Sequence, residues 1–369
     1  MLKFAIIGAG AGGQSMAAIL TDKGYTTRLY DIDKEKIHRL QELDTIKVTG
    51  VIECEAKPAV ITDSIEEVMT DVDVVMIVST TDAHGSIAAQ IKPYLKDGQI
   101  VMLNPGHCGG ALEIANVLRG ENGCGKELII AEAGDLMYGC RSYEIGNILH
   151  TGLKVHVPVA TLPAGDVTKL LEVLGPIFPC LNPAANVLET GFEGAGAMLH
   201  PIPSLMNVNK MDLGESYDYY MEGITPHIAD IISACDKERV AVCRALGVDA
   251  LDLISMLTKT YKLEKKDNLY DLIQSIESYK ALRNPTNTKH RFIVEDTMSG
   301  LVPLASVGHS LGIATPMMDS FINIASAVCG RDFWKEGRTA EKLGLAGKTA
   351  AEIQEMVPQD QEGGGLTWA

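Results

Sequence analysis

His200 is the side chain whose type and surroundings best suit acid–base chemistry. It lies in MLHPIPSLMN (198–207), an otherwise apolar segment in which two prolines disfavour a regular helix. An imidazole with an unperturbed pKa of about 6.5 can transfer protons at neutral pH. A histidine satisfied inside a helical core would give the same pattern, so the spacing alone leaves both interpretations open. The other histidines fit less well, since His150 falls on a predicted strand and His227 on a helix face.

Two other stretches carry polar groups that could bind a ligand or take part in chemistry. NPGHCGG (104–110) follows an apolar strand pattern, and parallel sheets bind ligands at the carboxyl ends of their strands. TKHRFIVEDTMSGLVP (288–303) places Arg291 and Asp296 among other charged side chains, just before an apolar helix pattern. From the residues alone, such a stretch is more simply a solvated turn whose acidic side chains favour the dipole of the following helix.

The N-terminal segment IIGAGAGG predicts a dinucleotide-binding turn between a strand and a helix. Gly8 permits the tight turn, Gly10 lets the backbone approach a pyrophosphate, and Gly13 allows the helix to pack closely on the strand. The helix would then direct its first N–H groups and the positive end of its dipole at the phosphates. Asp31, at the end of the second strand pattern, can accept hydrogen bonds from ribose hydroxyls and repels a 2′-phosphate.

These residues predict NAD as the cofactor. NADP stays open as the alternative, because three cationic side chains lie close to Asp31 in the sequence: Arg28, Lys34 and Arg39. We expect the loop after the fourth strand pattern to complete the cofactor site through Asn104, Pro105 and Gly106.

The elements that must position these residues divide the chain into two halves. The first half alternates strand and helix patterns, as a parallel sheet with right-handed crossovers requires. Its strand patterns lie at 2–8, 26–33, 71–80, 98–106, 127–134, 146–152 and 153–160, with helix patterns ending near 23 and at 34–43, 83–95 and 164–178.

From about Asn186 onward, strand patterns nearly vanish. The segment 225–247 predicts a long helix with Thr225 as N-cap, Pro226 at the first position and Gly247 after its end. Further helix patterns cover 268–282, 300–312 and 318–330. We therefore expect an α/β doubly wound Rossmann domain at 1–188, followed by a mostly α-helical domain at 189–369.

Length, charge and cysteine pattern exclude several classes of function. A chain of 369 residues exceeds the usual size of a single core. Its net charge of −16, with no long basic run, argues against a nucleic acid or an anionic membrane as partner. The eight cysteines are scattered without a CxxC pair, so we expect reduced thiols in a cytoplasmic enzyme, without a metal site. A homodimer is compatible with the sequence, which does not determine the oligomeric state.

The combination of motifs resembles the opine dehydrogenase family, the NAD/NADP octopine/nopaline dehydrogenases, over nearly the whole chain. The segments that carry the resemblance are IIGAGAGG, LNPG, NVLETGFEGAGAMLHP and TKHRFIVEDTMSGLVPLASVG. The last two are long, and they are far more specific than the glycine pattern. The resemblance implies a Rossmann domain followed by an all-α domain, in agreement with the element patterns.

The resemblance also implies roles for individual residues. The family's catalytic histidine, in a His-Pro pair, falls on His200, and its partner aspartate, in a Glu-Asp pair before Gly-Leu-Val-Pro, falls on Asp296. The arginine that binds a substrate carboxylate falls on Arg291, and the acidic residue of the nucleotide site falls on Asp31. We also expect Asn207 to contact substrate. No motif in 212–285 identifies the amino-acid pocket.

The reaction implied is reductive condensation of a 2-oxo acid with an amino acid, through an imine, by an NAD(P)-dependent oxidoreductase acting on CH–NH groups. The sequence does not select the substrate pair or the physiological direction. One alternative is a related reductase of a hydroxy acid or sugar phosphate, similar to ketopantoate reductase or glycerol-3-phosphate dehydrogenase, which would rely on Lys210. Another is a dinucleotide-binding sensor without chemistry, which the acidic composition and the lack of a DNA-binding helix pair disfavour.

Overall fold

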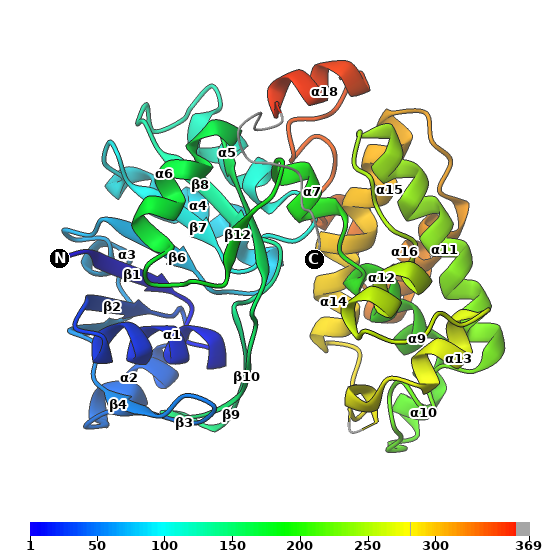
Figure 1. The fold of residues 1–369 in the computed structure, drawn as a ribbon, viewed down its shortest axis with the longest axis horizontal. Helices are drawn as coiled ribbons and strands as arrows, with labels where there is room; N and C mark the ends of the chain where they lie inside the picture. The colour runs from blue at the N-terminus through cyan, green and yellow to red at the C-terminus, as the bar shows by residue number, and fades with distance from the viewer. Residues whose placement is uncertain (281, 359–369) are drawn as a thin grey trace. The chain divides into compact units, whose positions relative to one another are not determined.

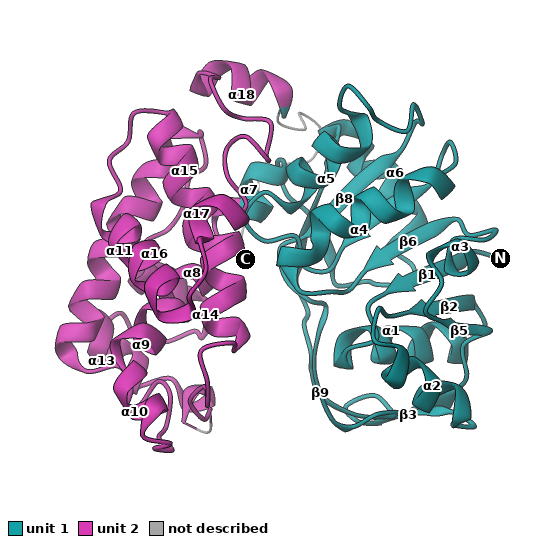
Figure 2. Ribbon diagram, turned by 180° about the vertical axis from the view of Figure 1, so that it is seen from behind, with its two compact units in different colours: residues 1–191, 357–369 teal, residues 192–356 magenta. Residues whose placement is uncertain are grey.

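The computed structural model describes residues 1–280 and 282–358 and shows an α/β part followed by a mostly helical part (Figure 1). This confirms the predicted fold class. The chain divides into two compact units, Met1–Gly191 and Phe192–Met356 (Figure 2). It returns to the first unit at Val357, whose carbonyl oxygen accepts a hydrogen bond from Asn186 Nδ2 at 3.1 Å. The predicted domain limits placed all of 189–369 in the second domain.

The main sheet of the first unit has eight strands in the order β12-β11-β8-β7-β6-β1-β2-β5. From β5 to β8 this is the strand order 3-2-1-4-5-6 of dinucleotide-binding sheets, with the reversal of order between β1 and β6. All neighbours are parallel except β8 and β11. The strands are β1 (Lys3–Ile7), β2 (Thr26–Tyr30), β5 (Val60–Thr62), β6 (Val74–Ile77), β7 (Ile100–Leu103), β8 (Ile129–Ala133), β11 (Val157–Leu162) and β12 (Leu181–Pro183).

A second sheet of four strands, in the order β4-β3-β10-β9, was not predicted. Its strands are β3 (Ile46–Gly50), β4 (Cys54–Ala56), β9 (Tyr138–Glu144) and β10 (Asn147–Leu153). The first two are inserted after the second helix and the last two after β8, so residues about 100 positions apart in the chain pair with each other. These strands expose many side chains, and β9 lacks an apolar alternation, which is why the sequence pattern predicted only the 146–152 strand.

The helices of the first unit pack on the main sheet, and α1 (Ala11–Asp22) lies between it and the second sheet. α1 contacts strands of both sheets, and its side chains from Gly13 to Leu20 are therefore buried without interruption. The other helices are α2 (Lys34–Glu42), α3 (Ile65–Val68), α4 (His84–Ile91), α5 (Gly110–Arg119) and α6 (Val167–Leu174), and α7 (Val187–Phe192) leads into the second unit.

The second unit is built from helices joined by turns and by longer segments. The helices are α8 (Gly196–Leu199), α9 (Pro201–Met206), α10 (Val208–Asp212), α11 (Pro226–Ala245), α12 (Leu253–Thr260), α13 (Leu269–Gln274), α14 (Arg291–Asp296), α15 (Val302–Ser310), α16 (Pro316–Cys329), α17 (Phe333–Glu336) and α18 (Ala350–Met356). The longer segments include those between α10 and α11 and between α13 and α14. No helix in the described ranges combines the length and apolar character needed to cross a membrane.

α11 confirms the helix predicted from its terminal residues. It begins after Thr225 with Pro226 at its first position, and Gly247 follows its end with a positive φ of 80°. Arg239, which is fully buried, fixes its middle by donating to Asp236, to the Glu193 carbonyl and to the Leu251 carbonyl. The helix predicted at 268–282 is instead the short α13 and a 3₁₀ turn at Glu277–Tyr279.

His150 on β10 is a buried histidine without polar partners. Its exposure is 1 %, and neither ring nitrogen has a hydrogen-bond partner among the described residues. Its ring lies 4.9 Å from that of Tyr138, and burial lowers the pKa of the imidazole below its usual value. The folded protein therefore favours neutral His150, whereas the unfolded chain protonates it below about pH 6.5.

We expect the free energy of unfolding to fall on acidification because of His150. At pH values above about 6.5 both states hold a neutral imidazole, and below it only the unfolded state gains the proton, at up to about 1.4 kcal/mol per pH unit. Urea unfolding at several pH values should show a shallower acid dependence in His150→Leu than in the native protein. His227→Leu, at an exposed position on α11, is the control for the removal of an imidazole. Equal slopes in all three proteins would contradict the assignment.

Candidate active site

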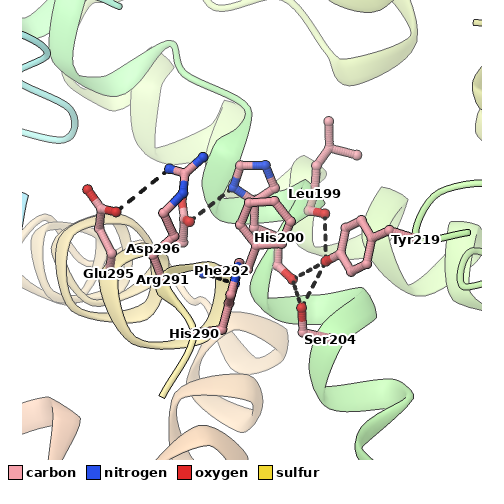
Figure 3. A network of polar contacts seen from close by, with 9 residues as sticks. All are labelled: Leu199, His200, Ser204, Tyr219, His290, Arg291, Phe292, Glu295 and Asp296. Atoms are coloured by element: carbon pink, nitrogen blue, oxygen red, sulfur yellow. Dashed lines mark hydrogen bonds and ion pairs between the residues drawn. The ribbon is translucent and has the colours of Figure 1, made fainter. Parts of the chain in front are cut away.

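The chain places His200 in hydrogen-bond contact with Asp296 across 96 residues of sequence. His200 lies between α8 and α9, where Pro201 begins a new helix, and Asp296 is the last residue of α14. His200 Nδ1 and Asp296 Oδ2 are 3.0 Å apart (Figure 3). Both side chains are mostly buried, with 20 % and 13 % of their surfaces exposed. The two residues that the family resemblance pairs thus form a polar contact in this chain.

The partner fixes which nitrogen of His200 can act on a substrate. An ionised carboxylate only accepts hydrogen bonds, so Nδ1 of the neutral ring carries the proton and donates it to Asp296. Nε2 then holds the lone pair and can take up a proton, and the carboxylate stabilises the resulting imidazolium. The geometry is that of an oriented acid–base histidine.

An aromatic ring and two hydroxyl groups hold His200 from its other sides. Phe292 stacks on the imidazole with ring centroids 4.1 Å apart and an interplanar angle of 8°. The Tyr219 hydroxyl donates to the His200 carbonyl oxygen at 2.5 Å, and Ser204 Oγ donates to the same oxygen at 2.7 Å (Figure 3). Burial raises the pKa of Tyr219 well above its usual value, so its hydroxyl remains a donor. Sequence reasoning missed these three residues, because each resembles an ordinary core residue.

Glycines allow the two segments of the pair to approach each other. A Cβ at Gly196 on α8 would lie 3.0 Å from Asp296 Oδ1 and 3.7 Å from His200 Nδ1. A Cβ at Gly300 would lie 2.8 Å from the Cβ of Ala197. Gly300 belongs to a π-helical turn, Thr297–Leu301, that follows Asp296 directly, and such turns are frequent at functional sites.

Arg291 begins the helix that ends at Asp296. Its side chain is 59 % exposed, with NH1 3.8 Å from Glu295 Oε2 and the guanidinium 5.2 Å from the Phe292 ring centroid. The interpretation of this stretch as a solvated turn is wrong. Arg291–Asp296 is itself helical, and Glu295 is only 8 % exposed, because Phe292 and Ile293 draw this helix into the core.

The buried side chain of Asn207 joins two backbone segments of the second unit through hydrogen bonds. Its Nδ2 donates to the carbonyl oxygens of Pro203 at 2.9 Å and Gly223 at 2.8 Å, and the residue is 7 % exposed. Both amide hydrogens are therefore engaged, so a contact with substrate would have to use Oδ1. The proposed role of Asn207 in substrate binding stays a prediction.

The glycine-rich turn of the first unit has the geometry its spacing predicts. Gly8 has a φ of 111°, and a Cβ there would lie 2.4 Å from the Val78 carbonyl oxygen. A Cβ at Gly13 would lie 1.7 Å from the Gly8 carbonyl oxygen, so α1 rests directly on the turn. A Cβ at Gly10 would meet no described atom within 4 Å, which leaves open space at the N-terminus of α1. This is where a pyrophosphate would bind.

Asp31 follows β2 and lies beside this turn. Its Oδ2 accepts from Ala9 N at 2.7 Å and pairs with Lys36 Nζ at 3.0 Å, and its Oδ1 accepts from Asp33 N at 2.9 Å. Lys36, on the first turn of α2, is a neighbour that sequence reasoning missed, although Lys34 and Arg39 of the same helix were considered. Its distance of five residues from Asp31 could have indicated it.

The loop after β7 is held by a buried carboxylate. Glu132 is fully buried on β8, where its Oε2 accepts from Ala111 N at 2.7 Å and its Oε1 accepts from Thr190 Oγ1 at 2.6 Å. A Cβ at Gly106 would lie 2.3 Å from Glu132 Oε2, so the loop needs glycine there. Asn104 is 1 % exposed, and its Oδ1 has no hydrogen-bond partner among the described residues. The unpaired Asn104 Oδ1 and the open space at the N-terminus of α1 are both compatible with a bound dinucleotide.

Comparison with known proteins agrees with both units. Residues 183–329 match the NAD/NADP octopine/nopaline dehydrogenase, alpha-helical domain family, and residues 3–105 match the NAD binding domain of 6-phosphogluconate dehydrogenase. The opine dehydrogenase of Arthrobacter sp. (strain 1C) is 35% identical over 355 residues, which cover 96% of this chain and 98% of that protein. The chain belongs to the opine dehydrogenase family.

Solved structures of the family share the fold. Octopine dehydrogenase with NADH and L-arginine superposes with a TM-score of 0.78 at 20% identity, covering 96% of this chain and 98% of that one. Yersinopine dehydrogenase with NADP⁺ gives a TM-score of 0.73 at 15% identity, with the same coverage. Like the family, the chain is an NAD(P)-dependent oxidoreductase that condenses an oxo acid with an amino acid. Among the described residues, no group of three His, Cys, Asp or Glu side chains could hold a metal ion.

In this opine dehydrogenase, Gly196→Ala should lower kcat by about tenfold or more, because the new Cβ would lie 3.0 Å from Asp296 Oδ1 and displace the carboxylate that orients His200. NADH oxidation with an oxo acid and amino acids measures kcat, and fluorescence titration measures NADH binding, which should not change. Gly194→Ala is the matched control, since a Cβ there meets no described atom within 4 Å. If both variants keep native kcat, the close approach at Gly196 is not required.

Proposed function

We propose that His200 is the acid–base catalyst of this opine dehydrogenase, that Asp296 is its partner, and that Arg291 binds a substrate carboxylate. The observation that supports this proposal is the 3.0 Å contact between His200 Nδ1 and Asp296 Oδ2. Asp296 ends α14, and the same helix begins with the exposed guanidinium of Arg291. The cofactor supplies the hydride that reduces the imine carbon.

His200 moves the proton through Nε2. When amine and oxo acid condense, the hydroxyl of their adduct leaves as water, and the imidazolium donates the proton that makes it a leaving group. In the reverse direction the neutral ring takes a proton back. The carboxylate of Asp296, mostly buried beside Nδ1, stabilises the imidazolium of His200 in both directions of the reaction.

Arg291 can bind the carboxylate that oxo acids and amino acids share. A guanidinium makes two parallel hydrogen bonds to a carboxylate, which lysine cannot reproduce. Its contact with Glu295 is long, at 3.8 Å, and its side chain is exposed, so an incoming carboxylate can compete for the same N–H groups.

We propose a small 2-oxo acid such as pyruvate as one substrate and an L-amino acid as the other. Octopine dehydrogenase has been captured with pyruvate and with L-arginine, which supports the two classes without selecting the amino acid. A matrix of NADH oxidation with 2-oxo acids against amino acids identifies the pair. The alternative, a hydroxy-acid or sugar-phosphate reductase relying on Lys210, would oxidise NADH without an amine. The Lys210 ammonium group lies 4.7 Å from the Tyr217 ring centroid, a contact that serves packing.

NAD is the preferred cofactor in this proposal, with NADP as the alternative. The carboxylate of Asp31 would accept hydrogen bonds from the ribose hydroxyls of NAD and would repel the 2′-phosphate of NADP. Asn104, Pro105 and Gly106 would complete the site. Lys36 partly offsets this preference, since its ammonium group lies 3.0 Å from Asp31 Oδ2 and would attract a phosphate.

His200→Ala should reduce turnover by about 10²- to 10⁴-fold while leaving NADH affinity unchanged, because the variant loses proton transfer but keeps the nucleotide turn. Rates with pyruvate and a mixture of L-amino acids, together with NADH fluorescence titration, measure the two effects. His227→Ala, at an exposed position on α11, is the control. A near-native rate in His200→Ala would remove the assignment, and loss of activity in Lys210→Ala alone would favour the alternative reductase.

Asp31→Ser should shift the cofactor preference towards NADPH. The variant loses the ribose acceptor and the charge that repels the 2′-phosphate, while Lys36 remains. The ratio of kcat/KM for NADH to that for NADPH is expected to fall by about tenfold, which corresponds to about 1.4 kcal/mol. Asp44→Ser, at an exposed position after α2, should leave the ratio unchanged. An unchanged ratio in Asp31→Ser would show that another group selects the cofactor.

A further inference from the structure

We propose that His290 is a positioning residue for the His200–Asp296 pair, acting as a neutral imidazole that caps α14 and supports Phe292. The proposal rests on the proposed role of His200 and adds a second histidine that no family motif assigned. Sequence reasoning quoted the segment that contains His290 but gave this residue no task.

The first observation is the cap itself. His290 has an extended backbone, with φ of −62° and ψ of 144°, and its Nδ1 accepts a hydrogen bond from Phe292 N at 3.2 Å. Serine, threonine, aspartate and asparagine usually provide this acceptor at a helix start. α14 has only six residues, so its first turn carries Phe292 and its last residue is Asp296. The cap therefore acts on both side chains that hold His200.

The second observation is a series of ring contacts from His290 to His200. The His290 ring meets Phe292 edge to face, with centroids 4.8 Å apart and planes at 83°. The Phe292 ring in turn stacks on His200 at 4.1 Å and 8°. Figure 3 shows His290 and Phe292 together at the start of α14, with the dashed line from the Phe292 backbone to His290. A displacement of His290 thus alters the surface on which the His200 ring rests.

The third observation is that the cap requires a particular protonation state. A nitrogen that accepts the Phe292 N–H cannot carry a proton, so neutral His290 is protonated at Nε2. His200, whose Nδ1 donates to Asp296, is the opposite tautomer. Burial lowers the pKa of His290, and unfavourable electrostatic interactions with Arg291 and His200 lower it further, against the opposing effect of Asp296. The cap is therefore intact at neutral pH, and it is lost once acidification protonates Nδ1.

Ring ¹⁵N NMR of the full-length protein tests the geometry without substrate. We expect the Nε2–H tautomer for His290 and the Nδ1–H tautomer for His200. On acidification, proton uptake by His290 should also shift the ring signals of His200. This coupled shift should be absent in His290→Asn, which retains an acceptor at the cap but does not titrate. An Nδ1–H tautomer for His290, or the same coupled shift in His290→Asn, would overturn the proposal.

Turnover tests the positioning role. With NADH, pyruvate and a mixture of L-amino acids at neutral pH, kcat of His290→Ala should fall about fivefold to tenfold, as expected for loss of a cap. His290→Asn should keep kcat within about twofold of native. His227→Ala is again the control, and NADH affinity should be native in every variant. Native kcat in His290→Ala would overturn the proposal.

The two proposals fail differently. If His200→Ala is inactive while His290→Ala is native, only the positioning role fails. If His200→Ala retains turnover, the proposed catalytic role fails whatever the His290 variants show. Thermal unfolding of His290→Ala separates a local effect from misfolding. An alanine variant that unfolds at the native temperature has lost the cap and the ring contact with Phe292 without misfolding, and His290→Asn preserves the test if the alanine variant does not fold.

Discussion

The hydrogen bond between His200 Nδ1 and Asp296 Oδ2 is the contact on which the proposed active site depends. It requires a helix break at Pro201 that leaves His200 outside regular helix, and a short helix whose last residue is Asp296. It also requires two segments that approach closely enough to exclude a methyl group at Gly196. Burying a carboxylate and an imidazole costs less free energy when they form a hydrogen bond with each other. The contact that orients the His200 ring therefore also stabilises its burial.

Around this hydrogen bond, apolar and polar contacts together fix the orientation of the His200 ring. Asp296 determines the tautomer, Phe292 determines the plane, and Tyr219 holds the backbone through the His200 carbonyl. Each contact restricts a different degree of freedom, which leaves Nε2 as the nitrogen available for proton transfer. A histidine with only one of these contacts would rotate between orientations, and proton transfer depends on geometry before it depends on pKa.

In the nucleotide-binding unit, the backbone of the glycine-rich turn is determined by steric restrictions at single residues and not by side-chain contacts. Glycine is required at positions 8 and 13 because a Cβ atom there would clash with neighbouring backbone atoms, whereas a Cβ atom at Gly10 would meet open space. Such requirements are local, so the spacing of the glycines and the position of Asp31 after β2 were sufficient to predict them. The four-stranded second sheet was not predictable in this way, because β3 and β10 come from distant segments with exposed side chains.

The sequence by itself determined the alternation of strands and helices that forms most of the main sheet, the ends of α11, and the family to which the chain belongs, but it did not predict β3, β4, β5, β9, α3 or α5. These depend on periodicity, on terminal residues and on long motifs, all of which are properties of neighbouring residues. The family resemblance implied that His200 and Asp296 are partners. Only the tertiary structure showed their 3.0 Å contact, the packing of Phe292 and the hydrogen bond of Tyr219 that support His200, and the cap that His290 places on α14. Those contacts join residues up to 96 positions apart, and side chains of ordinary core type reveal their role only through what they touch.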